Sequence, residues 1–252
     1  METQESEFYK AVKCTNAAKS VNKMLKEWYA RARDAASQQR KVAWSMVGVP
    51  SELFTTFDVD AVWPENFGTV CASRQVAVHF MSEAEADGYS MDLCSYSRNS
   101  LGYLRRRDEV HGVPPEAPLG GLAEPDMLIT PGRDCDIRMK WFQAQATRFG
   151  KTPLHIFEVP CPPYGSDLED ESLKKHYIKL HMDGLKGFVS FLEQHTGKKY
   201  DEARLSQAIV DSQEALRLFY EIDKLRRTVP SPMPSEDHYS VIIPELFMLG
   251  EK

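Results

Sequence analysis

Short apolar segments alternate with helical stretches through the middle of the chain, and this alternation restricts the possible folds more than any other feature. Four segments have the apolar run and turn-forming flanks of buried strands: residues 41–49, 60–63, 127–130 and 153–159. Four other stretches have the apolar spacing of helices: residues 51–57, 71–87, 95–107 and 137–149. Strands separated by helices of this length are typical of a parallel sheet. We therefore expect an α/β fold with a Rossmann or flavodoxin-like parallel sheet.

Helical segments flank this alternation on both sides. Residues 5–39 are polar and carry apolar side chains at helical spacing, which predicts one long amphipathic helix or a pair. Beyond residue 166, two long helical stretches are interrupted at Gly197, and a proline cluster at residues 230–234 follows them. We expect four parts: an N-terminal helical segment (1–40), an α/β domain that carries the site (41–165), a helical hairpin (166–229), and a linker with the start of a truncated second domain (230–252).

The composition excludes several classes of protein. Among the 252 residues, 42% are hydrophobic and 27% are charged, so the chain can bury a sizeable core and is not expected to be disordered. The net charge is -6, and the basic run at residues 105–107 lacks interleaved aromatic residues, so we expect no nucleic-acid partner. No segment approaches the roughly 20 apolar residues that cross a bilayer, and the sequence does not open with a secretion signal. We therefore expect a cytoplasmic protein with no membrane partner.

The five cysteines are widely spaced, and their odd number argues against a disulfide framework. Cys94 and Cys135 each lie where a loop or strand is expected to lead into a helix. Ligands bind at the carboxyl edge of a parallel sheet, and the partial positive charge of a helix N-terminus lowers the pKa of a thiol there. The two thiolates could therefore meet at one metal centre. Because no CxxC pair is present, packed free cysteines are the alternative, also for Cys14, Cys71 and Cys161.

Six sequence blocks follow one another in order between residues 41 and 160: GVPSEL (48–53), WPENFG (63–68), GYSMDLCSY (88–96), PDMLI (125–129), CD (135–136) and VP (159–160). In this order the blocks resemble the family of 2-hydroxyacyl-CoA dehydratases and benzoyl-CoA reductases. The helical segment up to residue 234 is also similar to that family. The resemblance is to the D-component of 2-hydroxyglutaryl-CoA dehydratase, without its C-terminal domain.

The resemblance implies an oxygen-sensitive subunit with a [4Fe–4S] cluster that three cysteines hold. In that family, a separate ATP-dependent iron–sulfur activator supplies electrons that reduce a thioester carbonyl to a ketyl radical, and a second homologous cluster-carrying subunit is the partner. The first two ligands fall on Cys94 and Cys135. The family's third ligand lies far downstream, where this chain has no cysteine; Cys161 or, as a weaker candidate, Cys71 could replace it. Two thiolates alone would hold the cluster less securely than three.

Two polar residues at the ends of predicted strands are candidate catalytic groups. The hydroxyl of Ser45 could donate a hydrogen bond to a thioester oxygen, and the carboxylate of Glu65 could move a proton. The structural alternatives are a buried strand hydroxyl bonded to the backbone for Ser45 and a helix or loop cap for Glu65. Asn66 and Arg98 could contact CoA or the cluster edge, or could have structural roles.

We expect a subunit of an enzyme that acts on acyl-CoA or aroyl-CoA thioesters by benzoyl-CoA reduction or 2-hydroxyacyl-CoA dehydration, with a preference for reduction. The chain has neither a P-loop nor a GxGxxG motif, so we do not expect it to hydrolyse ATP. The alternative is a non-catalytic structural or partner-binding fragment of the same family without a complete cluster site. A zinc-dependent hydrolase is disfavoured because the cysteines lack close pairing.

Overall fold

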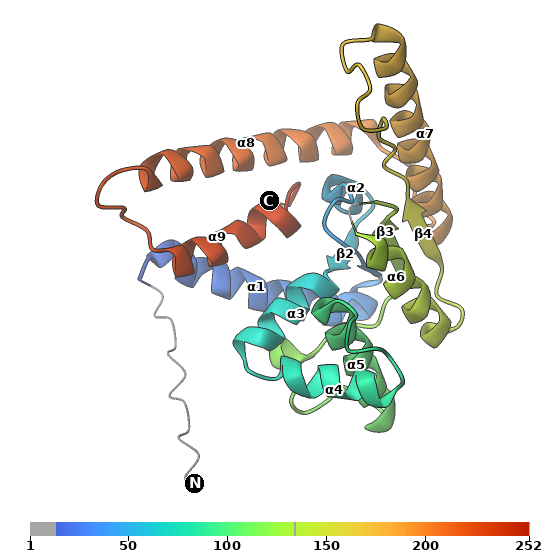
Figure 1. Cartoon of the computed structure of the whole chain (residues 1–252), viewed down its shortest axis with the longest axis vertical. Coiled ribbons are helices and arrows are strands. Elements are labelled where there is room, and N and C mark those ends of the chain that lie inside the picture. The colour runs from blue at the N-terminus through green and yellow to red at the C-terminus, as the bar shows by residue number, and fades with distance from the viewer. Residues whose placement is uncertain (1–13, 134, 252) are drawn as a thin grey trace.

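A computed structural model describes residues 14–133 and 135–251 and contains one four-stranded sheet (Figure 1). All its strands are parallel, in the order β2-β1-β3-β4. Their bounds are β1 (Lys41–Trp44), β2 (Val59–Val62), β3 (Met127–Pro131) and β4 (Leu154–Phe157). The expected α/β fold is confirmed. β1 ends earlier than predicted because the chain turns away after residue 45 through Gly48, whose φ is 100°.

The strand order creates a switch point between β1 and β3. Ala43 of β1 pairs with Ala61 of β2 on one side and with Met127 of β3 on the other. The chain therefore leaves β1 first toward β2 and then crosses back to β3. In an open parallel sheet, ligands bind outside the carboxyl ends of the two strands at which the direction reverses. The loops that follow β1 and β3 are thus the place where a site is expected.

Helices cover both faces of the sheet. On one face, α2 (Ser51–Thr56) and α7 (Glu171–Thr196) meet through Phe54 and Phe188, whose ring centroids lie 5.8 Å apart. On the opposite face, α6 (Asp136–Phe149) packs against β3 and β4, and Phe149 touches Trp44 of β1 edge to face at 5.1 Å. These aromatic contacts bury both sides of the strands, which explains their continuous apolar runs.

Three helices connect β2 with β3: α3 (Pro64–Ser73), α4 (Ala77–Ala86) and α5 (Ser95–Glu109). The single helix predicted for residues 71–87 is wrong, because Gln75 adopts a left-handed φ of 64° and separates α3 from α4. Pro64 suits the first turn of α3, where a missing N–H costs no helical hydrogen bond. Gly88 has a φ of 94° just after α4, as predicted for its C-terminal cap.

The C-terminal part contains two long helices and one shorter helix: α7, α8 (Glu202–Arg226) and α9 (Ser235–Phe247). The predicted break at Gly197 is confirmed, since this residue ends α7 with a φ of 74°. However, α7 and α8 diverge in Figure 1 and do not lie side by side as a hairpin, because α7 packs on β4 while α8 packs on α2. The hairpin geometry that we expected is therefore wrong.

The N-terminal helix α1 (Asn16–Asp34) is followed by a short 3-10 helix, η1 (Ala35–Gln38). The first residues of the predicted helix 5–39 lie outside the described part of the chain. α9 packs against α1, and the backbone N–H of Thr15 donates a hydrogen bond to Asp237 at 2.6 Å. The division of the chain into four parts stays a prediction. Across residues 14–133 and 135–251, no helix is long and apolar enough to cross a membrane.

Candidate functional site

Ser45 follows β1 directly and lies at the switch point of the sheet. Its backbone N–H donates a hydrogen bond to Val62 O at 2.9 Å, and the residue is completely buried. Its hydroxyl has no hydrogen-bond partner among the residues that the structure describes. The hydrogen bond to the backbone that we considered as the structural role of Ser45 is therefore not found there. A buried hydroxyl without a partner is uncommon because leaving water without a new hydrogen bond costs free energy. The described residues therefore leave the hydrogen-bonding capacity of Ser45 Oγ unused.

Glu65 lies in the first turn of α3, at the carboxyl end of β2, and both of its oxygens accept hydrogen bonds. Oε2 accepts from the backbone N–H of Val47 at 2.9 Å, and Oε1 accepts from Nη2 of Arg138 at 3.1 Å. Arg138 also donates from Nη1 to Val47 O at 3.0 Å. Glu65 and Arg138 are only 16% and 12% exposed, so this carboxylate is held by the loop after β1 and by α6.

Sequence reasoning missed Arg138. The sequence feature that could have pointed to Arg138 is its position in the first turn of a predicted helix, three residues after the candidate ligand Cys135. Many surface arginines occupy such positions, so this feature alone does not identify a functional residue. Only the fold brings this side chain from α6 to the loop after β1. There its planar guanidinium can bind a carboxylate and a carbonyl at once, which a lysine cannot do in the same geometry.

Cys94 and Cys135 are the N-cap residues of α5 and α6, and both are exposed. Each was predicted to lie where the chain enters a helix, and the structure places both residues there. Cys135 lies in the loop between β3 and α6, at the switch point of the sheet. Cys94 lies at the end of the loop between α4 and α5, directly before α5. Because α5 packs against α6, the two cysteines cap neighbouring helices.

Cys71 lies in the hydrophobic core on α3, and burial raises the pKa of its thiol to about 12. This thiol stays protonated near neutral pH and is a poor metal ligand there. Cys161 is exposed in the segment after β4. Within the described ranges, no three or more His, Cys, Asp or Glu side chains are grouped so that they could hold a metal ion. The donor set found at the helix N-termini therefore consists of two thiols.

Asn66 and Arg98 both have structural partners. Asn66 is buried, and its Oδ1 accepts a hydrogen bond from the hydroxyl of Tyr29 at 3.0 Å. Arg98 donates to Glu85 at 2.5 Å and to Leu93 O at 3.1 Å, which fixes the start of α5 to α4 and to the loop before it. These contacts agree with the structural alternative for both residues.

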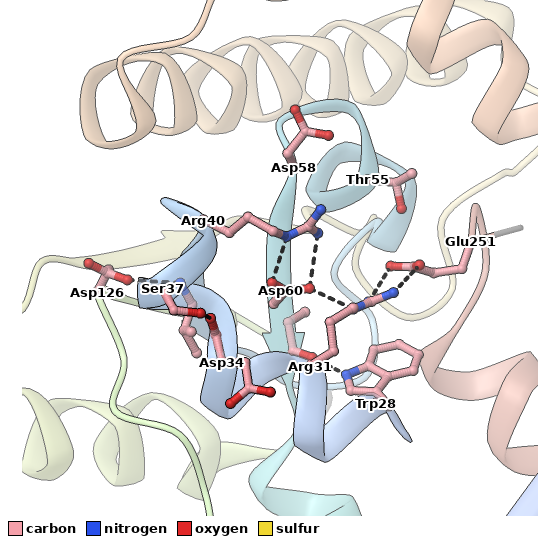
Figure 2. Close-up of polar contacts among 12 residues, drawn as sticks. Trp28, Arg31, Asp34, Ser37, Arg40, Thr55, Asp58, Asp60, Asp126 and Glu251 are labelled. Carbon is pink, nitrogen blue, oxygen red and sulfur yellow. Dashed lines mark hydrogen bonds and ion pairs between the residues drawn. The ribbon is translucent and has the colours of Figure 1, made fainter. Parts of the chain in front are cut away.

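Figure 2 shows a second charged group that sequence reasoning missed, centred on the completely buried Asp60 of β2. Arg40 donates to its two oxygens at 2.7 and 2.9 Å, and Nε of Arg31 lies 2.7 Å from Oδ1. Arg31 also binds Glu251 with two hydrogen bonds, at 2.8 and 2.9 Å. Because it joins α1, β2 and the segment after α9, we interpret this group as structural.

A comparison with protein families gives a match to the model described as 2-hydroxyglutaryl-CoA dehydratase, D-component, over residues 46–252. The chain is 28% identical to the alpha subunit of the (R)-2-hydroxyisocaproyl-CoA dehydratase of Clostridioides difficile, over 92% of this chain and 53% of that subunit. It is 26% identical to the alpha subunit of the lactoyl-CoA dehydratase of Anaerotignum propionicum, over 83% of this chain and 49% of the relative. It is 24% identical to a subunit of the benzoyl-CoA reductase of Thauera aromatica, over 78% of this chain and 43% of the relative.

The chain thus spans about half the length of the curated relatives it matches. The matched family region begins one residue after Ser45 and includes Glu65, Cys94 and Cys135. It covers β2, β3 and β4 and all of the helices from α2 to α9. The family resemblance of the sequence blocks is therefore confirmed, and the chain belongs to the 2-hydroxyglutaryl-CoA dehydratase D-component family.

Proposed function

We propose that this chain is a subunit of an iron–sulfur enzyme that acts on CoA thioesters by ketyl-radical chemistry, as a benzoyl-CoA reductase or a 2-hydroxyacyl-CoA dehydratase. The observation that carries the proposal is the group of residues at the carboxyl edge of the sheet. Ser45, Glu65 and Cys135 follow β1, β2 and β3 there, and Cys94 caps the helix packed against α6. The names of the relatives, which are dehydratase and reductase subunits, support the reaction class.

The two polar residues have different parts in this proposal. In this proposal the hydroxyl of Ser45, which has no hydrogen-bond partner among the described residues, donates a hydrogen bond to a thioester carbonyl oxygen, where negative charge develops on reduction. Glu65 is oriented by Val47 and Arg138, which already occupy both of its oxygens. To accept a proton from a substrate, Glu65 must therefore exchange one of these donors for the substrate group.

Cys94 and Cys135 supply two thiols for an iron–sulfur cluster, which would transfer single electrons when bound. They do not complete the set of three cysteines that the family resemblance implies, and no group of three ligands occurs within the described residues. All five cysteines lie within the described residues, so the proposal requires a further ligand from a partner subunit. We propose a second homologous subunit and an ATP-dependent iron–sulfur activator as partners in the cytoplasm; the relatives that are named as subunits support the subunit partner.

Anaerobic iron and sulfide analysis with EPR spectroscopy tests this proposal. The purified chain is reconstituted alone and together with a homologous subunit, as wild type and as the variants Cys94→Ala, Cys135→Ala and Cys161→Ala. We expect about four irons per chain in the wild type and in Cys161→Ala, and loss of iron in the other two variants. Wild type that binds no iron in either setting, or iron that survives both substitutions, would contradict the proposal.

A second candidate function is a non-catalytic, partner-binding subunit of the same family. The observation that favours it is that the described residues offer two exposed thiols near the sheet edge and no group of three metal ligands. In that case the chain should form a stable complex with a homologous subunit in size-exclusion chromatography while binding no iron. Iron that depends on Cys94 and Cys135 excludes this candidate.

A further inference from the structure

A cavity of about 640 Å³ lies between α1, α3 and α9. Its volume falls in the range of small-molecule sites, roughly 300–1,000 Å³. The four candidate residues at the sheet edge, Ser45, Glu65, Cys94 and Cys135, are not among the residues that line it. A molecule in this cavity would therefore occupy a site separate from the one described above.

Much of the cavity wall is apolar, and all three helices contribute to it. Leu25 of α1 and Phe247 of α9 are buried, and Val70 of α3 is partly buried. Tyr239 and Leu246 of α9 are 74% and 41% exposed, so part of this wall faces water. Because the burial of apolar surface is favourable, the wall favours a ligand with an apolar part.

Asn66 of α3 is a buried polar residue in the wall of this cavity, and it is only 4% exposed. Its Oδ1 accepts a hydrogen bond from the hydroxyl of Tyr29 at 3.0 Å. Its amide nitrogen has no hydrogen-bond partner among residues 14–133 and 135–251. A buried donor without a partner costs free energy, so these N–H groups favour a ligand that brings an acceptor oxygen.

Lys26 brings a positive charge to the same part of the cavity. It lines the cavity one turn before Tyr29, the residue that binds Asn66, and residues three apart are neighbours on a helix. Lys26 is exposed and has no carboxylate partner among the described residues. Lys23, by contrast, is paired with Glu27 at 3.6 Å and does not line the cavity. An ammonium group beside amide N–H groups suits the two oxygens of a carboxylate.

A second basic residue, Arg74, lines the cavity farther along α3. It follows Asn66 by eight residues, which corresponds to about 12 Å along a helix. A short acid whose carboxylate contacts Asn66 and Lys26 does not need this arginine. A phosphate ester is less suitable than a carboxylate at Asn66, because it carries roughly two negative charges to a place with one nearby cation.

We propose that this cavity binds a small free monocarboxylic acid with an apolar tail. The amide N–H groups of Asn66 and the ammonium group of Lys26 hold the carboxylate, and the tail lies against Leu25, Val70 and Phe247. The acid is a bound ligand and takes part in no reaction there. This inference goes beyond the proposed function and does not depend on it, because it uses none of the candidate catalytic or cluster residues.

Calorimetric titration of linear acids from acetate to octanoate into the full chain tests the proposal. The affinity should rise roughly fourfold with each added methylene group, because each group buries further apolar surface. Hexanamide keeps a carbonyl acceptor but has no charge. It should therefore bind about tenfold more weakly than hexanoate.

Variants separate the two parts of the site. Lys26→Gln should weaken hexanoate binding about tenfold and leave hexanamide binding unchanged, since only the acid loses a charged partner. Thr69→Trp, at an exposed position on the cavity wall, should weaken both ligands, with an unchanged unfolding temperature showing that the fold is intact. The controls Lys23→Gln and Arg74→Gln should bind both ligands as the wild type does.

Three outcomes would overturn the proposal. The wild type could bind none of the acids, or bind them with an affinity that does not rise with chain length. Lys26→Gln and Thr69→Trp could bind hexanoate as tightly as the wild type, which would show that the acid is held elsewhere. Arg74→Gln could weaken hexanoate binding where Lys26→Gln does not. None of these results bears on the iron–sulfur proposal, which the iron content of the Cys94 and Cys135 variants decides.

Discussion

Burial separates Cys71, the weaker ligand candidate, from Cys135, one of the two preferred candidates. Cys71 packs in the core, where burial raises the pKa of its thiol to about 12, whereas Cys135 is exposed at the start of α6. Sequence spacing identified Cys94 and Cys135 as residues at helix starts, because helix boundaries depend on local pattern. It could not show that Cys71 lies near the buried Tyr29 and Tyr103, since that depends on how α1, α3 and α5 pack together.

The buried carboxylate of Asp60 forms ion pairs with Arg31 and Arg40. Asp60→Asn should lower the free energy of unfolding by about 2 kcal/mol, because Arg31 and Arg40 lose a buried charged acceptor. Both arginines are about one third exposed or less, so they can still turn partly to water, which limits the loss. Urea unfolding measures the difference.

Asp34→Asn is the matched control for Asp60→Asn. Asp34 is exposed on the same part of α1, so its substitution should change the free energy of unfolding by no more than a few tenths of a kcal/mol. Equal stability of the two variants would show that the ion pairs of Asp60 contribute nothing.

At the scale of elements, the sequence predicted which segments form strands, but it placed the end of β1 too late and missed one break between helices. Four strands and the α/β fold follow from apolar runs, because a strand buried on both faces needs a continuous apolar segment. The break at Gln75 was missed, since a left-handed residue is readily predicted at glycine but rarely at glutamine. The divergence of α7 and α8 was also missed, because it depends on which distant element each helix meets, β4 or α2.

The docking of α8 predicts a pH dependence of stability. Asp58 accepts hydrogen bonds from Arg204 and from Lys198, and these cations hold the pKa of its carboxyl well below its ordinary value. A depressed folded pKa stabilises the protein at pH values above the unfolded pKa, roughly 3.9, and this stabilisation is lost as the pH falls through the folded pKa. Asp58→Asn should therefore lower the unfolding temperature by about 2–4 °C at pH 6. The difference from wild type should shrink below about pH 4.

Thermal unfolding followed by circular dichroism between pH 3 and pH 7 measures this effect. Asp211→Asn is the control, because Asp211 lies on the same helix and the hydrogen bond it accepts comes from the neutral amide of Gln207. The control should follow the wild type at every pH. A constant difference between Asp58→Asn and wild type across the whole range would contradict the ion-pair explanation.

At the scale of the whole molecule, the fold places candidate site residues that are far apart in the sequence at one edge of the sheet. Ser45, Glu65 and Cys135 follow three different strands, and the strand order places their loops at one edge of the sheet. The sequence predicted that strand ends would carry the site. It could not predict that Arg138 would hold Glu65, nor that α9 would return to form a cavity with α1 and α3, because both depend on the packing of distant segments.

We propose that Cys94 and Cys135 converge on one site. Dibromobimane tests it directly, since this reagent becomes fluorescent only after both of its arms have alkylated thiols. We expect the reduced, iron-free chain to become fluorescent, Cys161→Ala to behave in the same way, and Cys94→Ala and Cys135→Ala to stay dark. Fluorescence that persists in both of these variants, or that never develops in the wild type, would show that the two thiols do not share a site.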